Sequence, residues 1–152
     1  MERTARDIMT ADPRTVVREL PVTDAARLMA ENRIGALPVL DGTKLVGIVT
    51  EGDLIMQEVK IEFPTYIHLL DGFIMYPPST AKFESELKKA VGATVGDVMT
   101  GNPVTVQADT TVADLATLMV DREVSRVPVL DGDKLVGIVS KSDIVRSLVA
   151  GE

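Results

Sequence analysis

Apolar and polar residues alternate in two different periods along the first 54 residues, which predicts strands and helices in a definite order. β-Branched residues at Thr15-Val16-Val17 follow a proline and predict a short strand. The next apolar residues recur at helical spacing, which predicts an amphipathic helix carrying Val22, Ala25, Ala26, Leu28 and Met29 on one face. Two more strands are expected over Ala36–Leu40 and Lys44–Val49, joined by a hairpin turn at Asp41-Gly42.

A second helix is predicted to open directly after the third strand, at Thr50-Glu51-Gly52-Asp53. The predicted order is therefore β-α-β-β-α. The third strand is apolar along most of its length, which is typical of a strand covered on both faces.

The same pattern returns 90 residues later without a gap. Residues 7–54 and 97–144 are identical at 23 of 48 positions. The second copy is predicted to contain a strand at Thr105-Val106, a helix from Val112, strands over Arg126–Leu130 and Lys134–Val139, and a helix opening at Ser140-Lys141-Ser142-Asp143. A unit of about 48 residues is too small to bury a good core alone, so the copies are expected to pack together about a pseudo-twofold axis, with paired grooves.

One difference between the copies concerns the start of the first helix. Thr111 and Asp114 have the spacing of a capping box, in which a hydroxyl and a carboxylate satisfy the free amides of the first turn. Proline stands at the corresponding position 21, so this cap is expected to be lost or changed in the first copy.

The segment between the copies, residues 55–94, has a different composition. It contains all five aromatic residues of the chain, together with the single histidine, His68. A helix is predicted to begin at Ser79 or Thr80 and to end at Gly92. The segment is too apolar for a flexible linker, and we expect it to pack against the repeats or against a dimer mate.

Composition and charge exclude several classes of function. The 152 residues are 45% hydrophobic, which suits a globular fold, and the net charge of −7 disfavours binding to nucleic acid or to anionic membrane surfaces. Without cysteine, and with one histidine, neither a metal site nor a histidine-based catalytic triad is expected. The charged first residues and the lack of a long apolar run predict no signal peptide or membrane span and favour a cytoplasmic protein.

The pattern Ser/Thr-x-x-Asp at the strand-to-helix turns has two explanations. It is a common capping box, with the aspartate placed favourably for the helix dipole. It also suits a nucleoside phosphate, because free amides and a hydroxyl at a helix start bind phosphate while a carboxylate accepts the hydroxyls of a ribose. The turn lacks a nearby base or nucleophile partner, so it is a poor arrangement for an enzyme.

In combination, these motifs resemble a pair of cystathionine β-synthase (CBS) domains. The matching residues are Asp7-Ile8-Met9-Thr10, the Leu28-Met29 helix end, Leu37-Pro38-Val39-Leu40-Asp41 and Leu45-Val46-Gly47-Ile48-Val49-Thr50, each with its counterpart 90 residues later. The resemblance implies an α/β fold, also classed as α+β, of two β-α-β-β-α repeats with pseudo-twofold symmetry. It places repeat 1 at residues 5–54, an inserted helical connector at 55–94, and repeat 2 at 95–150.

The resemblance also implies two clefts for adenosine-containing ligands such as AMP, ADP, ATP or S-adenosylmethionine, with no required cofactor. Asp53 and Asp143 would take ribose hydroxyls. One cleft would combine Thr50 and Asp53 with Thr105, Val106, Ser125 and Arg126. The other would combine Ser140, Lys141, Ser142 and Asp143 with Thr15, Val16, Gly35, Ala36 and Leu37.

The two implied clefts differ where a phosphate would lie. Arg126 suits a phosphate, or is an ordinary surface arginine, and its counterpart in the first repeat is Ala36. The Asp143 turn offers two serines and Lys141, whereas the Asp53 turn includes Glu51. Unequal affinities are expected, with the Asp143 cleft slightly favoured.

The resemblance implies that the protein is a regulatory, non-enzymatic sensor of adenosine ligands. It is expected to form a homodimer through its helices and to act on a separate effector protein. The alternative is a structural or protein-docking module with degenerate clefts. An enzyme of phosphate chemistry is disfavoured, because the sequence has neither a glycine-rich loop with lysine nor a metal cluster.

Overall fold

A computed structural model describes residues 2–55 and 93–150. The chain forms two compact units: the described parts of Met1–Thr15, Leu40–Gly47 and Gly101–Glu152 make unit 1, and those of Val16–Val39 and Ile48–Thr100 make unit 2. The helix predicted within the connector lies outside the described residues.

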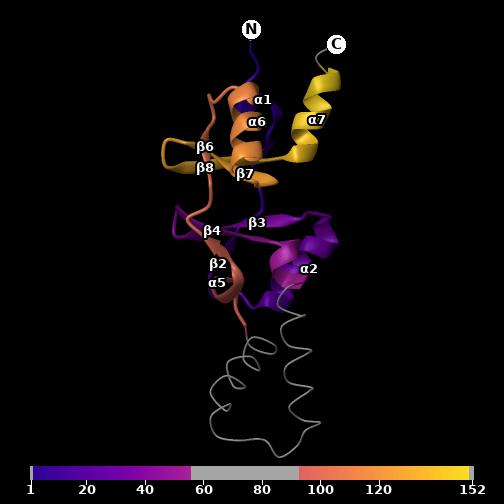
Figure 1. Cartoon of the computed structure of the whole chain (residues 1–152). Helices are drawn as coiled ribbons and strands as arrows, with labels where there is room; N and C mark the ends of the chain where they lie inside the picture. The colour runs from indigo at the N-terminus through magenta and orange to yellow at the C-terminus, as the bar shows by residue number, and fades with distance from the viewer. Residues whose placement is uncertain (1, 56–92, 151–152) are drawn as a thin grey trace, which may run out of the picture. The chain divides into compact units, whose positions relative to one another are not determined.

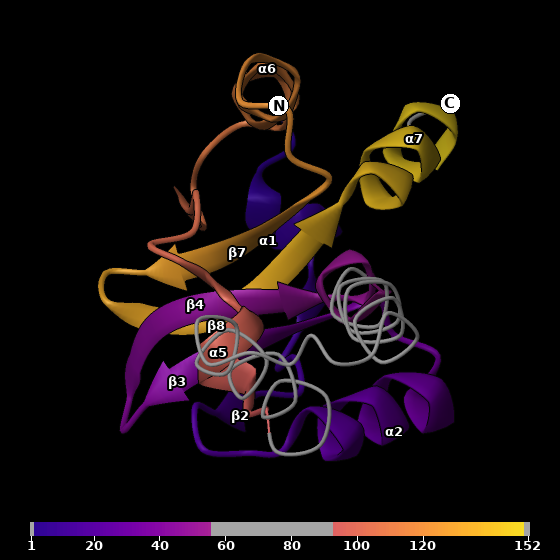
Figure 2. The ribbon, with the colours of Figure 1, turned by 60° about the horizontal axis from the view of Figure 1, so that its bottom comes forward.

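One four-stranded sheet has the order β1 (Thr10–Ala11), β8 (Lys134–Ser140), β7 (Arg126–Asp131), β6 (Val106–Gln107). Strand β7 pairs antiparallel with β8 and parallel with β6, while β1 pairs antiparallel with β8. Figure 2 shows β7 and β8 running in opposite directions, with α7 (Lys141–Ala150) continuing directly from β8.

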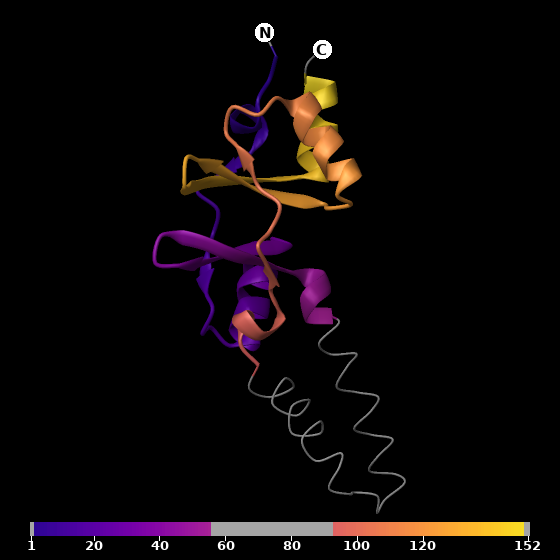
Figure 3. The same ribbon diagram turned by 60° about the vertical axis from the view of Figure 1, so that its left-hand side comes forward.

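Helices α1 (Ala5–Ile8), α6 (Val112–Asp121) and α7 lie on one face of this sheet (Figures 1 and 3). The core between them is built from small and β-branched residues with two larger side chains, Leu115 and Met119 of α6, which are 0% and 2% exposed. Val127, Val129 and Val139 of the sheet face them and are fully buried. The amphipathic pattern predicted for α6 is therefore confirmed.

The second sheet has the order β2 (Val16–Val17), β3 (Ala36–Asp41), β4 (Lys44–Thr50), β5 (Thr100–Gly101). Helix α2 (Val22–Asn32) and the short α5 (Val95–Val98) lie on the same side of β3 and β4 in Figure 1. Buried residues of unit 2 include Ala25 and Met29 of α2, Leu37 and Val39 of β3, and Val95 of α5. The strands and hairpins predicted for both repeats are thus present, and so are the helices, of which the one after β4 is described only over residues 51–55. The ends of the other elements differ from the prediction by one or two residues.

A short helix and strand, which were not predicted, precede each repeat pattern. Segment α1–β1 precedes the first copy, yet β1 belongs to the sheet of the second copy, where Thr10 pairs with Ile138 and Ala11 with Gly137. Likewise β5 precedes the second copy and belongs to the sheet of the first. Each copy therefore gives its opening strand to the other copy's sheet, so the order β-α-β-β-α is incomplete.

Matching backbone hydrogen bonds hold the two exchanged segments. In unit 1, Ala5 N–H donates to Thr110 O at 2.8 Å and Val112 N–H donates to Arg3 O at 2.9 Å. The corresponding bonds of unit 2 run from Val95 N–H to Leu20 O at 2.8 Å and from Val22 N–H to Ala93 O at 2.9 Å. The duplication in the sequence thus extends to the segments that are exchanged.

The caps of the first helices agree with the sequence. Thr111 Oγ1 accepts the N–H of Asp114 at 3.1 Å and caps α6. Pro21 begins α2 without a side-chain cap. The predicted hairpin turns are confirmed by Gly42 and Gly132, whose φ values of 65° and 66° suit glycine.

Candidate functional site

The Ser140–Asp143 turn connects the end of β8 to the start of α7. Asp143 Oδ2 accepts the N–H of Ser140 at 2.8 Å, and Ser140 Oγ accepts the N–H of Asp143 at 3.2 Å. This is a reciprocal capping box, and it fixes both the hydroxyl and the carboxylate at the first turn of the helix. The capping explanation of the sequence pattern is therefore correct as far as the fold is concerned.

Asp143 differs from ordinary capping residues in its burial. Its exposure is 8%, and it is the one buried polar or charged residue found within the described parts of the chain. Burying a carboxylate is costly unless it is paired and hydrogen-bonded. Arg146, one turn along α7, supplies the pairing through a contact from its guanidinium Nη2 to Asp143 Oδ1, while its own side chain remains 70% exposed.

The Thr50–Asp53 turn repeats this geometry in unit 2. Asp53 Oδ2 accepts the N–H of Thr50 at 2.8 Å, and Thr50 Oγ1 accepts the N–H of Asp53 at 3.3 Å. Asp53 is half-buried and the adjacent Glu51 is exposed. The two turns therefore share their hydrogen bonds but differ in the burial of the carboxylate and in the charge beside it.

Two further threonine–aspartate pairs show what a purely structural role looks like. Asp7 and Asp97 accept the N–H of Thr4 and Thr94 at 2.8 and 2.9 Å, at the start of α1 and α5. Both aspartates are exposed, and neither helix follows directly from a strand. The Ser/Thr-x-x-Asp pattern alone therefore does not indicate a ligand-binding site. Asp53 and Asp143 differ from Asp7 and Asp97 because their turns follow directly from a central strand.

Each of the two turns lies beside the start of the neighbouring strand of its own repeat. In unit 1, Lys141 N–H donates to Ser125 O at 3.1 Å, and Arg126 is the cross-strand partner of Ser140. In unit 2, Glu51 N–H donates to Gly35 O at 3.0 Å. Ser125 and Arg126 thus adjoin the Asp143 turn within their own sheet, and their predicted role in the Asp53 cleft stays a prediction.

The remaining predicted contact residues are distributed over both units. Val16, Ala36, Leu37 and Val106 are buried, so their side chains contribute to the cores. Thr15 and Thr105 stand just before β2 and β6, and Ser142 and Lys141 are exposed on the first turn of α7. The predicted pairings of these residues across the repeats stay predictions.

Arg146 is the residue of the Asp143 turn that the sequence analysis missed. Its spacing of three residues from Asp143 is a recognisable helical ion-pair signal. The corresponding position in the first repeat is Met56, so the sequence provides such a cation at one turn and not at the other.

Comparison with known proteins identifies the class to which this architecture belongs. The family model of the CBS domain matches residues 5–59 and 95–150. The chain therefore belongs to the CBS domain family and carries two CBS domains.

Relatives of known sequence span most of the chain. An uncharacterized protein of Methanocaldococcus jannaschii is 33% identical over 153 residues, covering 95% of this chain and 90% of that protein. The chloroplastic CBS domain-containing protein CBSX2 of Arabidopsis thaliana is 34% identical over 133 residues, which cover 83% of this chain and 54% of the plant protein.

Solved structures with the same fold include ligand complexes. The crystal structure of CBSX2 in complex with AMP matches with a TM-score of 0.74 and 28% identity, covering 97% of each chain. The CBS domain pair of protein MJ0100, in complex with 5-methylthioadenosine and S-adenosylmethionine, matches with a TM-score of 0.72 and 27% identity over both whole chains. The predicted α/β fold of a tandem CBS pair is confirmed by these matches.

Neither a membrane span nor a metal-binding cluster is present among residues 2–55 and 93–150. No helix among them combines the length and apolar character needed to cross a membrane. No cluster of three or more histidine, cysteine, aspartate or glutamate side chains in those ranges could hold a metal ion.

Proposed function

We propose that this protein binds an adenosine-containing ligand at its strand-to-helix turns and acts as a regulatory, non-enzymatic module. The observation that carries the proposal is Asp143, a buried carboxylate held at a helix start beside hydroxyl groups. Two CBS pairs of similar structure are described as complexes with AMP and with S-adenosylmethionine and 5-methylthioadenosine, which supports a ligand of this class.

The hydrogen bonds at Asp143 leave capacity for a ribose. An ionised carboxylate has about four acceptor sites. The Ser140 N–H and the Arg146 guanidinium occupy one oxygen each, which leaves acceptor capacity for two ribose hydroxyls. Ser142 and Lys141, exposed on the first turn of α7, would supply a hydroxyl and a cation to a phosphate, and Arg126, the cross-strand partner of Ser140, would add a second cation.

The two turns are proposed to bind with unequal affinity. The Asp143 turn lies beside Arg126 and carries Lys141, whereas the Asp53 turn lies beside Gly35 and carries Glu51. Because a phosphate is repelled by glutamate and attracted by lysine and arginine, a phosphorylated ligand should prefer the Asp143 turn. AMP, ADP and ATP are the expected ligands of this turn, and S-adenosylmethionine is the alternative that carries no phosphate.

A thermal-shift titration with AMP, ADP, ATP, S-adenosylmethionine and GTP tests the proposed function. A ligand that binds only the folded state stabilises it by about 2.7 kcal/mol at 100 times its dissociation constant. We expect adenosine compounds to raise the melting temperature and GTP to leave it unchanged. If none of the five compounds shifts a cooperative melting transition, the alternative of a protein-docking module replaces this proposal.

We also propose that the chain forms a homodimer through α6 and α7. Val120 of α6 and Val145, Leu148 and Val149 of α7 are 60–73% exposed, an unusual apolar content for the surface of two adjacent helices. A second copy would cover this surface and remove it from water. An effector protein of unknown identity is the partner through which the module would act.

Introducing a charge into this surface should separate the dimer. We expect Leu148→Glu to convert the dimer to a monomer in analytical ultracentrifugation, because an unpaired carboxylate is costly to bury. Val17→Glu is the matched control, since Val17 is 51% exposed and lies on β2 rather than on α6 or α7. A dimer that survives Leu148→Glu would exclude this face as the interface.

A further inference from the structure

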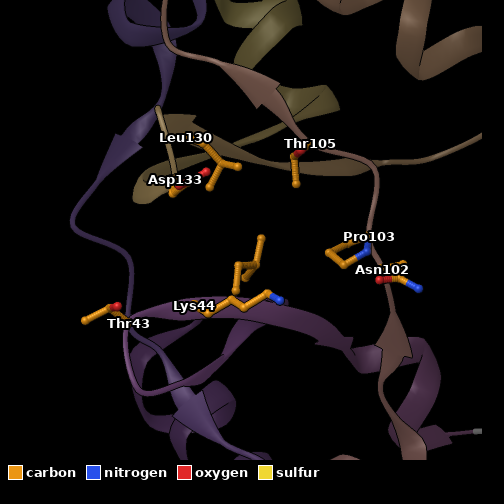
Figure 4. A pocket seen from close by; sticks show the side chains of 8 residues that line it. Thr43, Lys44, Asn102, Pro103, Thr105, Leu130 and Asp133 are labelled. Carbon is orange, nitrogen blue, oxygen red and sulfur yellow. The ribbon is translucent and has the colours of Figure 1, made fainter.

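A pocket of about 670 Å³ lies in unit 1, away from the strand-to-helix turn (Figure 4). It is lined by residues of three loops and the strand ends next to them: Thr43, Lys44 and Leu45; Asn102, Pro103 and Thr105; Leu130 and Asp133. Strand β8 begins at Lys134, next to this pocket, and ends at Ser140. At about 3.3 Å per residue, the hairpin wall of the pocket at Asp133 lies roughly 20 Å along β8 from the Asp143 turn. Thr105 lies nearer to the turn, because Val106 pairs with Val129, and the adjacent Pro128 pairs with Ile138.

The lining mixes apolar and polar side chains. Leu45, Leu130 and Pro103 provide the apolar surface, and the hydroxyls of Thr43 and Thr105 and the amide of Asn102 provide hydrogen bonds. The pocket volume falls within the range of small-molecule sites, about 300–1,000 Å³.

The charged side chains of the lining limit which ligands this pocket can bind. Lys44 is the cation among its lining residues and Asp133 the anion. In Figure 4 the Lys44 amine points toward Pro103, whereas Asp133 lies on the opposite wall. Neither side chain forms an ion pair with another residue of the described ranges, so both groups are available to a ligand.

The repeat shows that this charge arrangement is not imposed by the fold. Asn102 corresponds to Asp12, and both residues adopt the same positive φ, 48° and 49°. The backbone therefore accepts an aspartate at this position, but the sequence places a neutral amide beside Lys44. In a chain of net charge −7, the neutral side chain avoids adding a second anion to the lining beside Asp133.

We propose that this pocket binds a small organic anion with an apolar body, at its hairpin wall rather than at the Asp143 turn. Lys44 would hold the anionic group, assisted by Asn102 and Thr105, and the apolar body would cover Leu45 and Leu130. Asp133 would accept a hydrogen bond from a hydroxyl or N–H of the same ligand. The site thus takes an anion that also carries a donor, and it does not depend on the function proposed for the Asp143 turn.

The test uses 8-anilinonaphthalene-1-sulfonate, an apolar anion with one N–H donor, in an NMR titration of the full ¹⁵N-labelled chain. We expect saturable shifts of the backbone amides of Thr43, Lys44, Asn102, Thr105 and Asp133. Lys44→Gln should weaken binding about fivefold, and Asn102→Asp should weaken it as well by repelling the sulfonate.

Two matched controls come from the repeat. Lys134→Gln and Asp12→Asn change the corresponding residues, which do not line the pocket, and should leave the affinity unchanged. Shifts restricted to the exposed apolar residues of α6 and α7, equal affinities for Lys44→Gln and Lys134→Gln, or no saturable shifts at all would each overturn the proposal. A second titration with AMP present separates the two sites, since saturating AMP should leave the shifts at Lys44 unchanged.

Discussion

The double substitution Asp53→Ala/Asp143→Ala should abolish measurable binding of adenosine ligands. Hydrogen bonds to a charged group contribute about 1.5–3 kcal/mol, and each carboxylate is proposed to accept two ribose hydroxyls. The affinity at each turn should therefore fall by about 100-fold or more. Isothermal titration calorimetry of the wild type, both single variants and the double variant measures the loss at each turn separately.

The substitutions also remove a helix-capping bond, so stability needs its own control. Asp97→Ala breaks the equivalent bond from the N–H of Thr94 and lies at neither strand-to-helix turn. It should lower the free energy of unfolding by about 1 kcal/mol and leave ligand affinity unchanged. Binding retained by a folded Asp53→Ala/Asp143→Ala protein would show that these carboxylates do not hold the ligand.

The second large effect is a loss of stability on substitution of Gly137, which lies opposite Ala11 where β1 pairs with β8. A Cβ atom at this position would lie 2.3 Å from Met9 Sδ and 2.9 Å from the carbonyl oxygen of Thr10. The methionine side chain can move, but the Thr10 carbonyl belongs to the paired strand β1. Gly137→Ala should therefore displace the exchanged segment and lower the free energy of unfolding by about 1–3 kcal/mol.

Gly101→Ala is the matched control. Gly101 likewise lies in a strand, β5, but no atom lies within 4 Å of the position that its Cβ would take. Urea denaturation followed by circular dichroism compares the two variants. Equal stabilities would mean that β1 does not pack on β8 as closely as the structure shows. Met9→Ala should relieve part of the strain of Gly137→Ala, while the contact with the Thr10 carbonyl would remain.

Much of the fold can be predicted from the sequence because its signals are local and occur twice. The hairpins at Gly42 and Gly132 need only a turn that accepts a positive φ, and α2 and α6 need only their apolar faces. The exchange of β1 and β5 cannot be predicted in this way. These strands are two residues long, and their partners lie in the other repeat, so no periodicity marks them.

In the candidate site, too, the local features could be predicted from the sequence and the features formed by distant segments could not. The turns at Thr50 and Ser140 follow from the local pattern, and the structure confirms their hydrogen bonds. The hairpin at Gly132 implies that β7 pairs with β8, which places Arg126 opposite Ser140. The predicted contacts of Ser125 and Arg126 with the other repeat stay predictions. The Lys44 pocket was missed because its lining comes from loops that lie far apart in the sequence.

Calorimetric titration of the wild-type protein with AMP, with GTP as the comparison, tests the central claim most directly. The account predicts saturable binding of AMP, with no more than two molecules per chain and with the tighter site at Asp143, and no saturable heat with GTP. Equal binding of the two nucleotides would contradict an adenosine site. Absence of binding by AMP and by S-adenosylmethionine, on protein with a cooperative melting transition, would contradict the sensor function itself.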